Sequence, residues 1–127
     1  PYMPLYNAGK SALSSFTQSM ILEYEEFPTF IDYRMGDVKT DFNKVSAKQL
    51  QEKWSDPMKR AWHQIEKQLC HSPSPENAAT QIFNTISRGN SGVYYGGGRF
   101  QSKIAPWLPR FIPSTFLNKA LRKYYHL

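Results

Sequence analysis

The stretch TFIDYRMGDVKTDF, residues 29–42, decides the fold. Its first part, residues 29–35, is aromatic and β-branched, which predicts a short β-strand. The remainder, residues 36–42, contains glycine and charged side chains and predicts a loop that leaves the strand. A second strand is predicted over residues 92–98, where GVYYGGG ends in a glycine turn. A strand, a crossover helix and a second strand are typical of a right-handed βαβ unit with parallel strands.

Helical periodicity precedes the first strand. Apolar residues recur at three- and four-residue spacing from Ala8 to Ile21, which predicts a helix with one apolar face. Pro4 favours the turn that enters this helix, and Pro28 stops it after about Glu26. The residues before the first strand therefore predict one long helix.

Helical patterns also fill the connection between the two strands. A short pattern covers residues 46–54. A second pattern starts at Asp56 as its N-cap, with Pro57 at the first helical position. A third starts at Ser74 as its N-cap and ends near Gly89 as its C-terminal cap.

The predicted order is helix, strand, helices, strand and tail, which is an α/β arrangement within one domain of 127 residues. Two weak helical patterns in the tail are broken by Pro106, Pro109 and Pro113. Two strands are too few for a sheet that buries both of its faces. We therefore expect more strands upstream of Pro1, and a sheet that is incomplete on its own.

The excess positive charge is confined to the tail. The net charge is +6, and residues 1–98 carry ten Lys/Arg and ten Asp/Glu, so that their charges cancel. The tail, residues 99–127, carries six Lys/Arg and no acid, interleaved with aromatic and aliphatic residues. Such a segment is drawn to anionic surfaces, either lipid or nucleic acid. The alternatives are that it covers the core or forms a subunit contact.

Cysteine and histidine predict neither a disulfide framework nor a metal site. Cys70 is the single cysteine, which excludes a disulfide within the chain. His63 and His71 are eight residues apart and show no metal-ligand spacing with Cys70. The longest apolar stretches are far shorter than the roughly 20 residues that span a bilayer.

Tyr6 and Lys10 form the candidate catalytic pair. Residues four apart on a helix lie on one face, with Cβ atoms about 5–6 Å apart. A free tyrosine has a pKa near ~10, and a nearby ammonium favours its phenolate form. Such a tyrosine exchanges a proton with a carbonyl oxygen that becomes an alkoxide. In a chain with eight tyrosines, such a pair also arises by chance.

The residues around Tyr6 and Lys10 favour a catalytic pair over a chance occurrence. Small residues flank it in YNAGKSAL, and the loop GDVKT follows the next strand. Gly36 lets the backbone approach a ligand, and Thr40 offers a hydroxyl. In that order and spacing, the two motifs closely resemble the C-terminal part of the short-chain dehydrogenase/reductase family over residues 5–97.

The resemblance implies a Rossmann-type doubly wound parallel sheet, of which residues 1–98 are the C-terminal part. It also implies carbonyl/alcohol oxidoreduction with a nicotinamide cofactor, NADP or NAD. By position, Tyr6 would be the acid/base, and Lys10 would hold the nicotinamide ribose and favour ionisation of Tyr6. The Val38 backbone and the Thr40 side chain would contact the carboxamide of the nicotinamide.

The tail carries a narrower likeness. APWLPRFIPSTFLNKALRKYYHL is similar to the tails of fungal 1-acyldihydroxyacetone-phosphate reductases, which act on lipid precursors at the endoplasmic reticulum and lipid droplets. That likeness favours NADP and an apolar or lipid-like carbonyl or alcohol substrate, with residues 41–72 as the substrate loop. It implies a cytoplasmic protein, peripheral on those membranes, whose tail closes over substrate or docks on lipid. A homo-oligomer is a further expectation.

The chain also departs from the family pattern. Met35 stands where the family has proline, and Gly9 where it has serine or alanine. The Gly-rich phosphate loop, the catalytic serine and the upstream asparagine are missing. YGGGR, residues 95–99, is no substitute, because we expect no strand–turn–helix context there. The alternatives are an inactive truncated fragment without the cofactor-binding half and, less favoured, a binding module whose tail meets nucleic acid.

Overall fold

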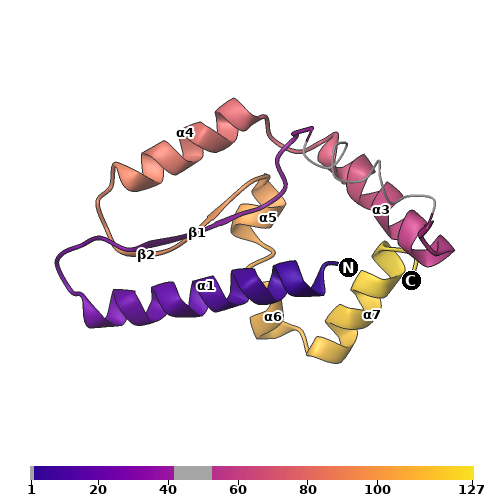
Figure 1. Cartoon of the computed structure of the whole chain (residues 1–127), viewed down its shortest axis with the longest axis horizontal. Coiled ribbons are helices and arrows are strands. Elements are labelled where there is room, and N and C mark those ends of the chain that lie inside the picture. Colours follow the sequence, from indigo (N-terminus) through magenta and orange to yellow (C-terminus); the bar gives the residue numbers. More distant parts are fainter. Residues whose placement is uncertain (1, 42–52) are drawn as a thin grey trace.

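The computed structural model describes residues 2–41 and 53–127, and it confirms the α/β class (Figure 1). Two strands lie between the longer helices, and three short helices form the tail. The helices are α1 (Pro4–Glu23), α3 (Asp56–Leu69), α4 (Pro75–Ile86), α5 (Arg99–Lys103), α6 (Leu108–Phe111) and α7 (Ser114–Tyr124), and the strands are β1 (Ile31–Met35) and β2 (Gly92–Gly96).

The two strands pair in parallel, as the sequence predicts. Ile31 lies opposite Gly92, and Met35 lies opposite Gly96. The ladder continues past the strand end, where the Gly36 N–H donates to the Gly96 carbonyl at 3.0 Å. α1 packs against β1, and α4 packs against both strands from the opposite side of the sheet (Figure 1). Within residues 2–41 and 53–127, this is a helix–sheet–helix arrangement two strands wide.

The first helix and the first strand are shorter than predicted. α1 ends at Glu23 rather than near Glu26, because carboxylates at a helix C-terminus oppose the helix dipole. β1 begins at Ile31 because the Phe30 N–H donates to Ser91 Oγ at 3.0 Å instead of joining the backbone ladder.

The start of α3 differs by one residue from the prediction. Ser55, and not Asp56, is the N-cap: its backbone is extended, and its carbonyl accepts the Lys59 N–H at 3.0 Å. Asp56 lies in the first turn, where its negative charge favours the helix dipole. The helix predicted over residues 46–54 falls mostly on residues 42–52, outside the described residues.

The start of α4 is confirmed. Ser74 Oγ accepts the Asn77 N–H at 3.3 Å, which satisfies one of the free donors of the first turn. Beyond the last residue of α4, Gly89 has a φ of +68° and donates its N–H to the Ile86 carbonyl at 2.9 Å. Gly89 therefore closes the helix end, as glycine does at this kind of turn.

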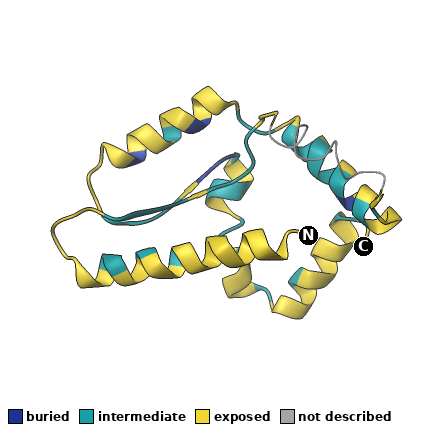
Figure 2. Cartoon of the chain, in the orientation of Figure 1, coloured by how far each residue is buried: buried dark blue, intermediate teal, exposed yellow. Residues whose placement is uncertain are grey.

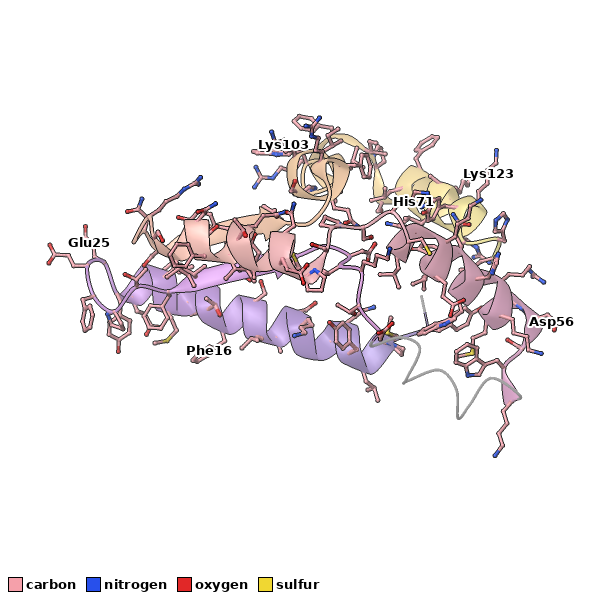
Figure 3. All side chains as sticks on the ribbon, turned by 90° about the horizontal axis from the view of Figure 1, so that it is seen from above. Phe16, Glu25, Asp56, His71, Lys103 and Lys123 are labelled. Carbon is pink, nitrogen blue, oxygen red and sulfur yellow. The ribbon has the colours of Figure 1, made fainter. Side chains whose placement is uncertain are left out.

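The tail contains three short helices where two were predicted. Pro109 does not break the chain there: it lies in the first turn of α6, where no N–H is required. Pro113 is the N-cap of α7. Figure 3 shows Lys103 of α5 and Lys123 of α7 on the same side of the molecule. Among the described residues, every helix is too short or too polar to cross a lipid bilayer.

Little apolar surface is buried (Figure 2). Among the described hydrophobic residues, only Ala61 and Ala78 are buried, whereas Leu5, Leu22 and Phe27 are at least 85% exposed. The accessible surface of the chain is 9969 Å², against about 6,900 Å² for a folded monomer of its mass. The chain therefore exposes about 3,000 Å² more than a closed domain of this size.

Candidate active site

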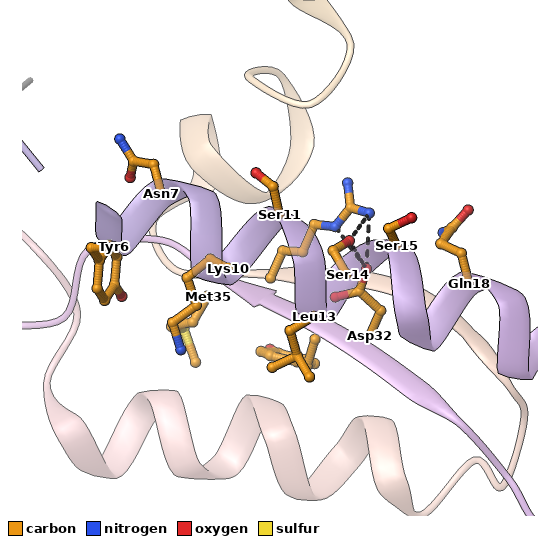
Figure 4. Close-up of a pocket in the computed structure, with 12 residues that line it drawn as sticks. Tyr6, Asn7, Lys10, Ser11, Leu13, Ser14, Ser15, Gln18, Asp32 and Met35 are labelled. Atoms are coloured by element: carbon orange, nitrogen blue, oxygen red, sulfur yellow. Dashed lines mark hydrogen bonds and ion pairs between the residues drawn. The ribbon is translucent and has the colours of Figure 1, made fainter. Parts of the chain in front are cut away.

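Tyr6 and Lys10 lie together at the N-terminal end of α1, beside the end of β1 (Figure 4). Lys10 Nζ is 5.5 Å from the centroid of the Tyr6 ring, so the ammonium lies next to the phenol. Both side chains are exposed, Tyr6 by 58%. The predicted pairing on one helix face is confirmed, and both groups are accessible to a ligand.

The pair opens into a groove between α1 and β1 (Figure 4). The groove has a volume of about 880 Å³, which is within the range of small-molecule sites. Hydroxyl and amide groups of α1 line it on one side, and Met35 lines it at the end of the strand. Met35 therefore takes part in the groove.

A polar cluster that the sequence analysis missed lies further along the same groove. Ser14 Oγ donates to Asp32 Oδ2 at 2.6 Å, and Arg34 Nη2 donates to Ser14 Oγ at 2.6 Å and to Asp32 Oδ2 at 2.8 Å. Partial burial raises the pKa of Asp32, but the hydrogen bond from Ser14 and the bonds and charge of Arg34 outweigh it, so that the pKa lies below its ordinary value. The cluster fastens α1 to β1.

One sequence signal points to this cluster. Asp32 and Arg34 are two residues apart in an otherwise apolar strand, so their side chains lie on the same face. That face is covered by α1, where Ser14 faces the two charges. The Asp32 side chain is only 10% exposed, and such a carboxylate requires polar partners because an unpaired buried charge is costly.

The loop after β1 is built around Asp37. Its N–H donates to Gln101 Oε1 at 3.0 Å, and its carboxylate Oδ2 accepts from Gln101 Nε2 at 2.6 Å and from Gln68 Nε2 at 2.7 Å. Gln68 Oε1 in turn accepts from the Tyr124 hydroxyl at 2.5 Å. Side chains of α3, α5 and α7 therefore hold the loop and connect it to the tail.

Protein atoms, and not open space, lie next to Gly36. A Cβ at Gly36 would overlap the Gln101 side chain, so the close approach that requires glycine here is to Gln101. Val38 is half-buried and Thr40 is exposed, and neither lines the groove that contains Tyr6. The structure thus brings Tyr6 and Lys10 together with Met35, but it does not place Val38 and Thr40 in the same groove.

The glycine turn after β2 differs from what we predicted for residues 95–99. A strand, the turn at residues 97–98 and a helix do follow one another, contrary to the prediction for YGGGR. The Gly97 N–H is bonded to Gln81 Oε1 at 3.0 Å, and Gly97 has a φ of +101°. Because the Gly97 N–H is used within the protein and α5 spans only five residues, the turn is a poor match to a phosphate loop.

These residues fit one end of a nicotinamide dinucleotide. Lys10 has the donors that ribose hydroxyls require, and Tyr6 has an accessible hydroxyl beside it. In the glycine turn, the Gly97 N–H is bonded to Gln81 and is not available to a pyrophosphate. No group of His, Cys, Asp and Glu in the described part of the chain is arranged to hold a metal ion.

Comparisons of the chain with protein-family models, with curated proteins and with solved structures find no match. The chemistry of the groove is therefore inferred from its residues and their geometry. Two features carry that inference: the adjacent phenol and ammonium, and their position at the carboxyl end of a parallel strand. In open α/β sheets, ligands bind at the carboxyl ends of the strands.

Proposed function

We propose that this chain forms part of an oxidoreductase that interconverts a carbonyl and an alcohol with NADP(H) or NAD(H). The observation that carries the proposal is the placement of Tyr6 and Lys10 side by side in the groove at the carboxyl end of β1. The motifs YNAGKSAL and GDVKT, at the spacing of the short-chain dehydrogenase/reductase family, support it.

Tyr6 handles the proton in this proposal. Its hydroxyl donates a proton to the carbonyl oxygen as negative charge develops there, and it takes the proton back in the reverse direction. Lys10 lies beside the ring, and its positive charge favours the phenolate that remains after donation. Lys10 would also hold the ribose hydroxyls of the cofactor, whereas Val38 and Thr40, which lie outside the groove, are given no part in the proposal. The cofactor supplies or accepts the hydride.

In this proposal, residues other than these 127 would bind the pyrophosphate end of the cofactor. The excess exposed surface of about 3,000 Å² supports this, because apolar side chains on both helices and strands lack the cover of a closed domain. The isolated chain is then an inactive part of the site. The likeness of the tail to those of fungal 1-acyldihydroxyacetone-phosphate reductases supports an apolar or lipid-like substrate, and the proposed location is the cytoplasmic surface of the endoplasmic reticulum or of lipid droplets.

The test is NADPH-dependent reduction of a panel of carbonyl compounds by the protein expressed from its complete reading frame. Tyr6→Phe removes one oxygen atom, and we expect it to lower kcat/KM by about 10²–10⁴-fold. Tyr24→Phe is the matched control, since Tyr24 lies outside the groove at the end of α1. Full activity of Tyr6→Phe would contradict the proposed role.

The codons upstream of Pro1 provide an independent test. We expect a strand followed by a Gly-rich turn and a helix, and a serine about a dozen residues before Tyr6. A start of translation immediately before Pro1 would exclude the proposed enzyme.

A further inference from the structure

The tail presents positive charge to solvent without compensation. All six of its cations are exposed, and in the described parts of the chain no carboxylate pairs with them. The tail contains no acid of its own, so its charge is not cancelled locally. These cations are Arg99, Lys103, Arg110, Lys119, Arg122 and Lys123.

The same segment also presents apolar side chains. Phe111 is 79% exposed and Phe116 is 66% exposed, so the described residues leave both rings accessible. Trp107 is half-exposed, and the guanidinium of Arg110 lies 4.9 Å from the centroid of its ring. Aromatic rings beside cations are typical of segments that lie at a membrane–water interface.

The spacing of residues along α7 places most of its apolar and most of its cationic side chains on different faces of the helix. Phe116, Ala120 and Tyr124 are four residues apart and share one face. Lys119 and Arg122 are three residues apart and lie away from that face, whereas Lys123, seven residues after Phe116, lies beside it. α7 is therefore a basic amphipathic helix.

The tail is held to the rest of the molecule at its end. The Tyr124 hydroxyl bonds to Gln68 of α3, and Arg60 Nε donates to the His126 carbonyl at 3.2 Å. In the view of Figure 3, the helices of the tail lie on one side of the molecule and α1 lies on the other. The exposed cations and rings of the tail are thus presented away from the groove that contains Tyr6.

We propose that residues 99–127 dock on the surface of an anionic lipid bilayer. The cations match the charge of anionic headgroups, and the exposed aromatic and aliphatic side chains enter the boundary between headgroups and acyl chains. A nucleic acid would match the charge and stack on the rings, but it offers no apolar phase for Ile104, Leu121 and Leu127, which are all more than 40% exposed. This inference does not depend on the oxidoreductase activity.

The test is flotation of the full chain with vesicles of phosphatidylcholine, alone or with about 30% phosphatidylserine. We expect binding only to the anionic vesicles, with a loss of binding as salt rises from about 0.05 M to 0.5 M. The triple variant Lys119→Gln, Arg122→Gln, Lys123→Gln should bind on the order of a hundredfold more weakly. The control removes the same charge elsewhere, at Lys59, Lys67 and Arg88, and should leave vesicle binding nearly unchanged.

A second readout reports the insertion of the apolar side chains. Vesicles with brominated acyl chains should quench Trp107, so that Trp107→Phe abolishes most of the quenching and Trp54→Phe does not. Equal binding by the two triple variants would overturn the proposal, as would binding without quenching. Retention of a single-stranded oligonucleotide in preference to anionic vesicles would overturn it in favour of nucleic acid.

Discussion

At the scale of single residues, the molecule is organised by polar side chains that join elements distant in sequence. Ser14, Asp32 and Arg34 fasten the first helix to the first strand. Gln101 and Asp37 fasten the tail to the loop after that strand. Such contacts matter more here than in an ordinary domain, because few apolar side chains are buried.

Asp32→Asn should destabilise the intact protein by about 1–2 kcal/mol at neutral pH, because it weakens the hydrogen bonds to Ser14 and Arg34. The pKa of Asp32 lies below its ordinary value of 3.8 in the fold, so its contribution to stability is present above that pH and is lost as the pH falls through the lowered pKa. Urea unfolding across pH measures this. The difference between wild type and variant should shrink in acid.

The exposed Glu25→Gln is the control for this change, and it should alter the free energy of unfolding by less than about 0.5 kcal/mol. A difference between wild type and Asp32→Asn that stays constant down to pH 2 would contradict the role given to the Asp32 carboxylate.

Two glycines should respond to alanine with opposite signs. Gly36→Ala places a Cβ against Gln101 and should destabilise the protein, partly rescued when Gln101→Ala shortens that side chain. Gly9 lies within α1 with nothing within 4 Å of an added Cβ, so Gly9→Ala should stabilise by about 0.5–1 kcal/mol. Thermal unfolding of Gly36→Ala, Gln101→Ala, their double variant and Gly9→Ala measures both effects, and the same sign for Gly36→Ala and Gly9→Ala would contradict the described geometry.

The sequence predicted part of the site at this scale. The helical spacing of Tyr6 and Lys10 is local, so their pairing follows from the sequence alone. The spacing of Asp32 and Arg34 is local, but their partner Ser14 and the partners of Asp37 are 18 to 64 positions away, and no local pattern predicts which residues these are. For the same reason, Gly36 was expected to face a ligand, whereas it faces Gln101.

At the scale of the elements, helix starts are marked by their caps, and the two internal helices differ in how they are capped. Ser74 caps α4 with its side chain, whereas Ser55 caps α3 with its backbone alone. Ser74→Ala should therefore cost about 1 kcal/mol of stability, and Ser55→Ala only a few tenths. Chemical denaturation of the two variants compares them directly. Equal costs would contradict the difference in capping.

Element types were predictable because their signals are local. Proline and serine mark the starts of the internal helices, and the β-branched and aromatic run marks β1. Element ends were less predictable. The end of α1 depends on the repulsion of carboxylates by the helix dipole, and the start of β1 depends on a side chain 61 residues away.

At the scale of the whole molecule, the dominant feature is the surface that remains exposed. Two strands and the helices around them leave about 3,000 Å² more surface than a closed domain of this mass. The isolated chain should therefore unfold in urea with a broad transition and a small m-value, because little surface becomes exposed on unfolding. A sharp two-state transition with the m-value of an ordinary domain of this length would contradict this reading.

The isolated chain should also fail to bind the cofactor, since the Gly97 N–H is bonded to Gln81 and the helix that follows the glycine turn spans only five residues. Titration of NADPH fluorescence measures this. We expect no quenching by the 127-residue chain. Micromolar binding would show instead that these 127 residues are sufficient to bind the cofactor.

The central claim is that Tyr6 exchanges the proton of a carbonyl/alcohol oxidoreduction. The most direct measurement follows deuterium from NADPH labelled at C4 of the nicotinamide into the alcohol made by the protein of the complete reading frame. We predict that wild type and Tyr24→Phe place the label on the carbinol carbon, and that Tyr6→Phe does so about 10²–10⁴-fold more slowly. An unlabelled alcohol from wild type, or undiminished transfer by Tyr6→Phe, would contradict the claim.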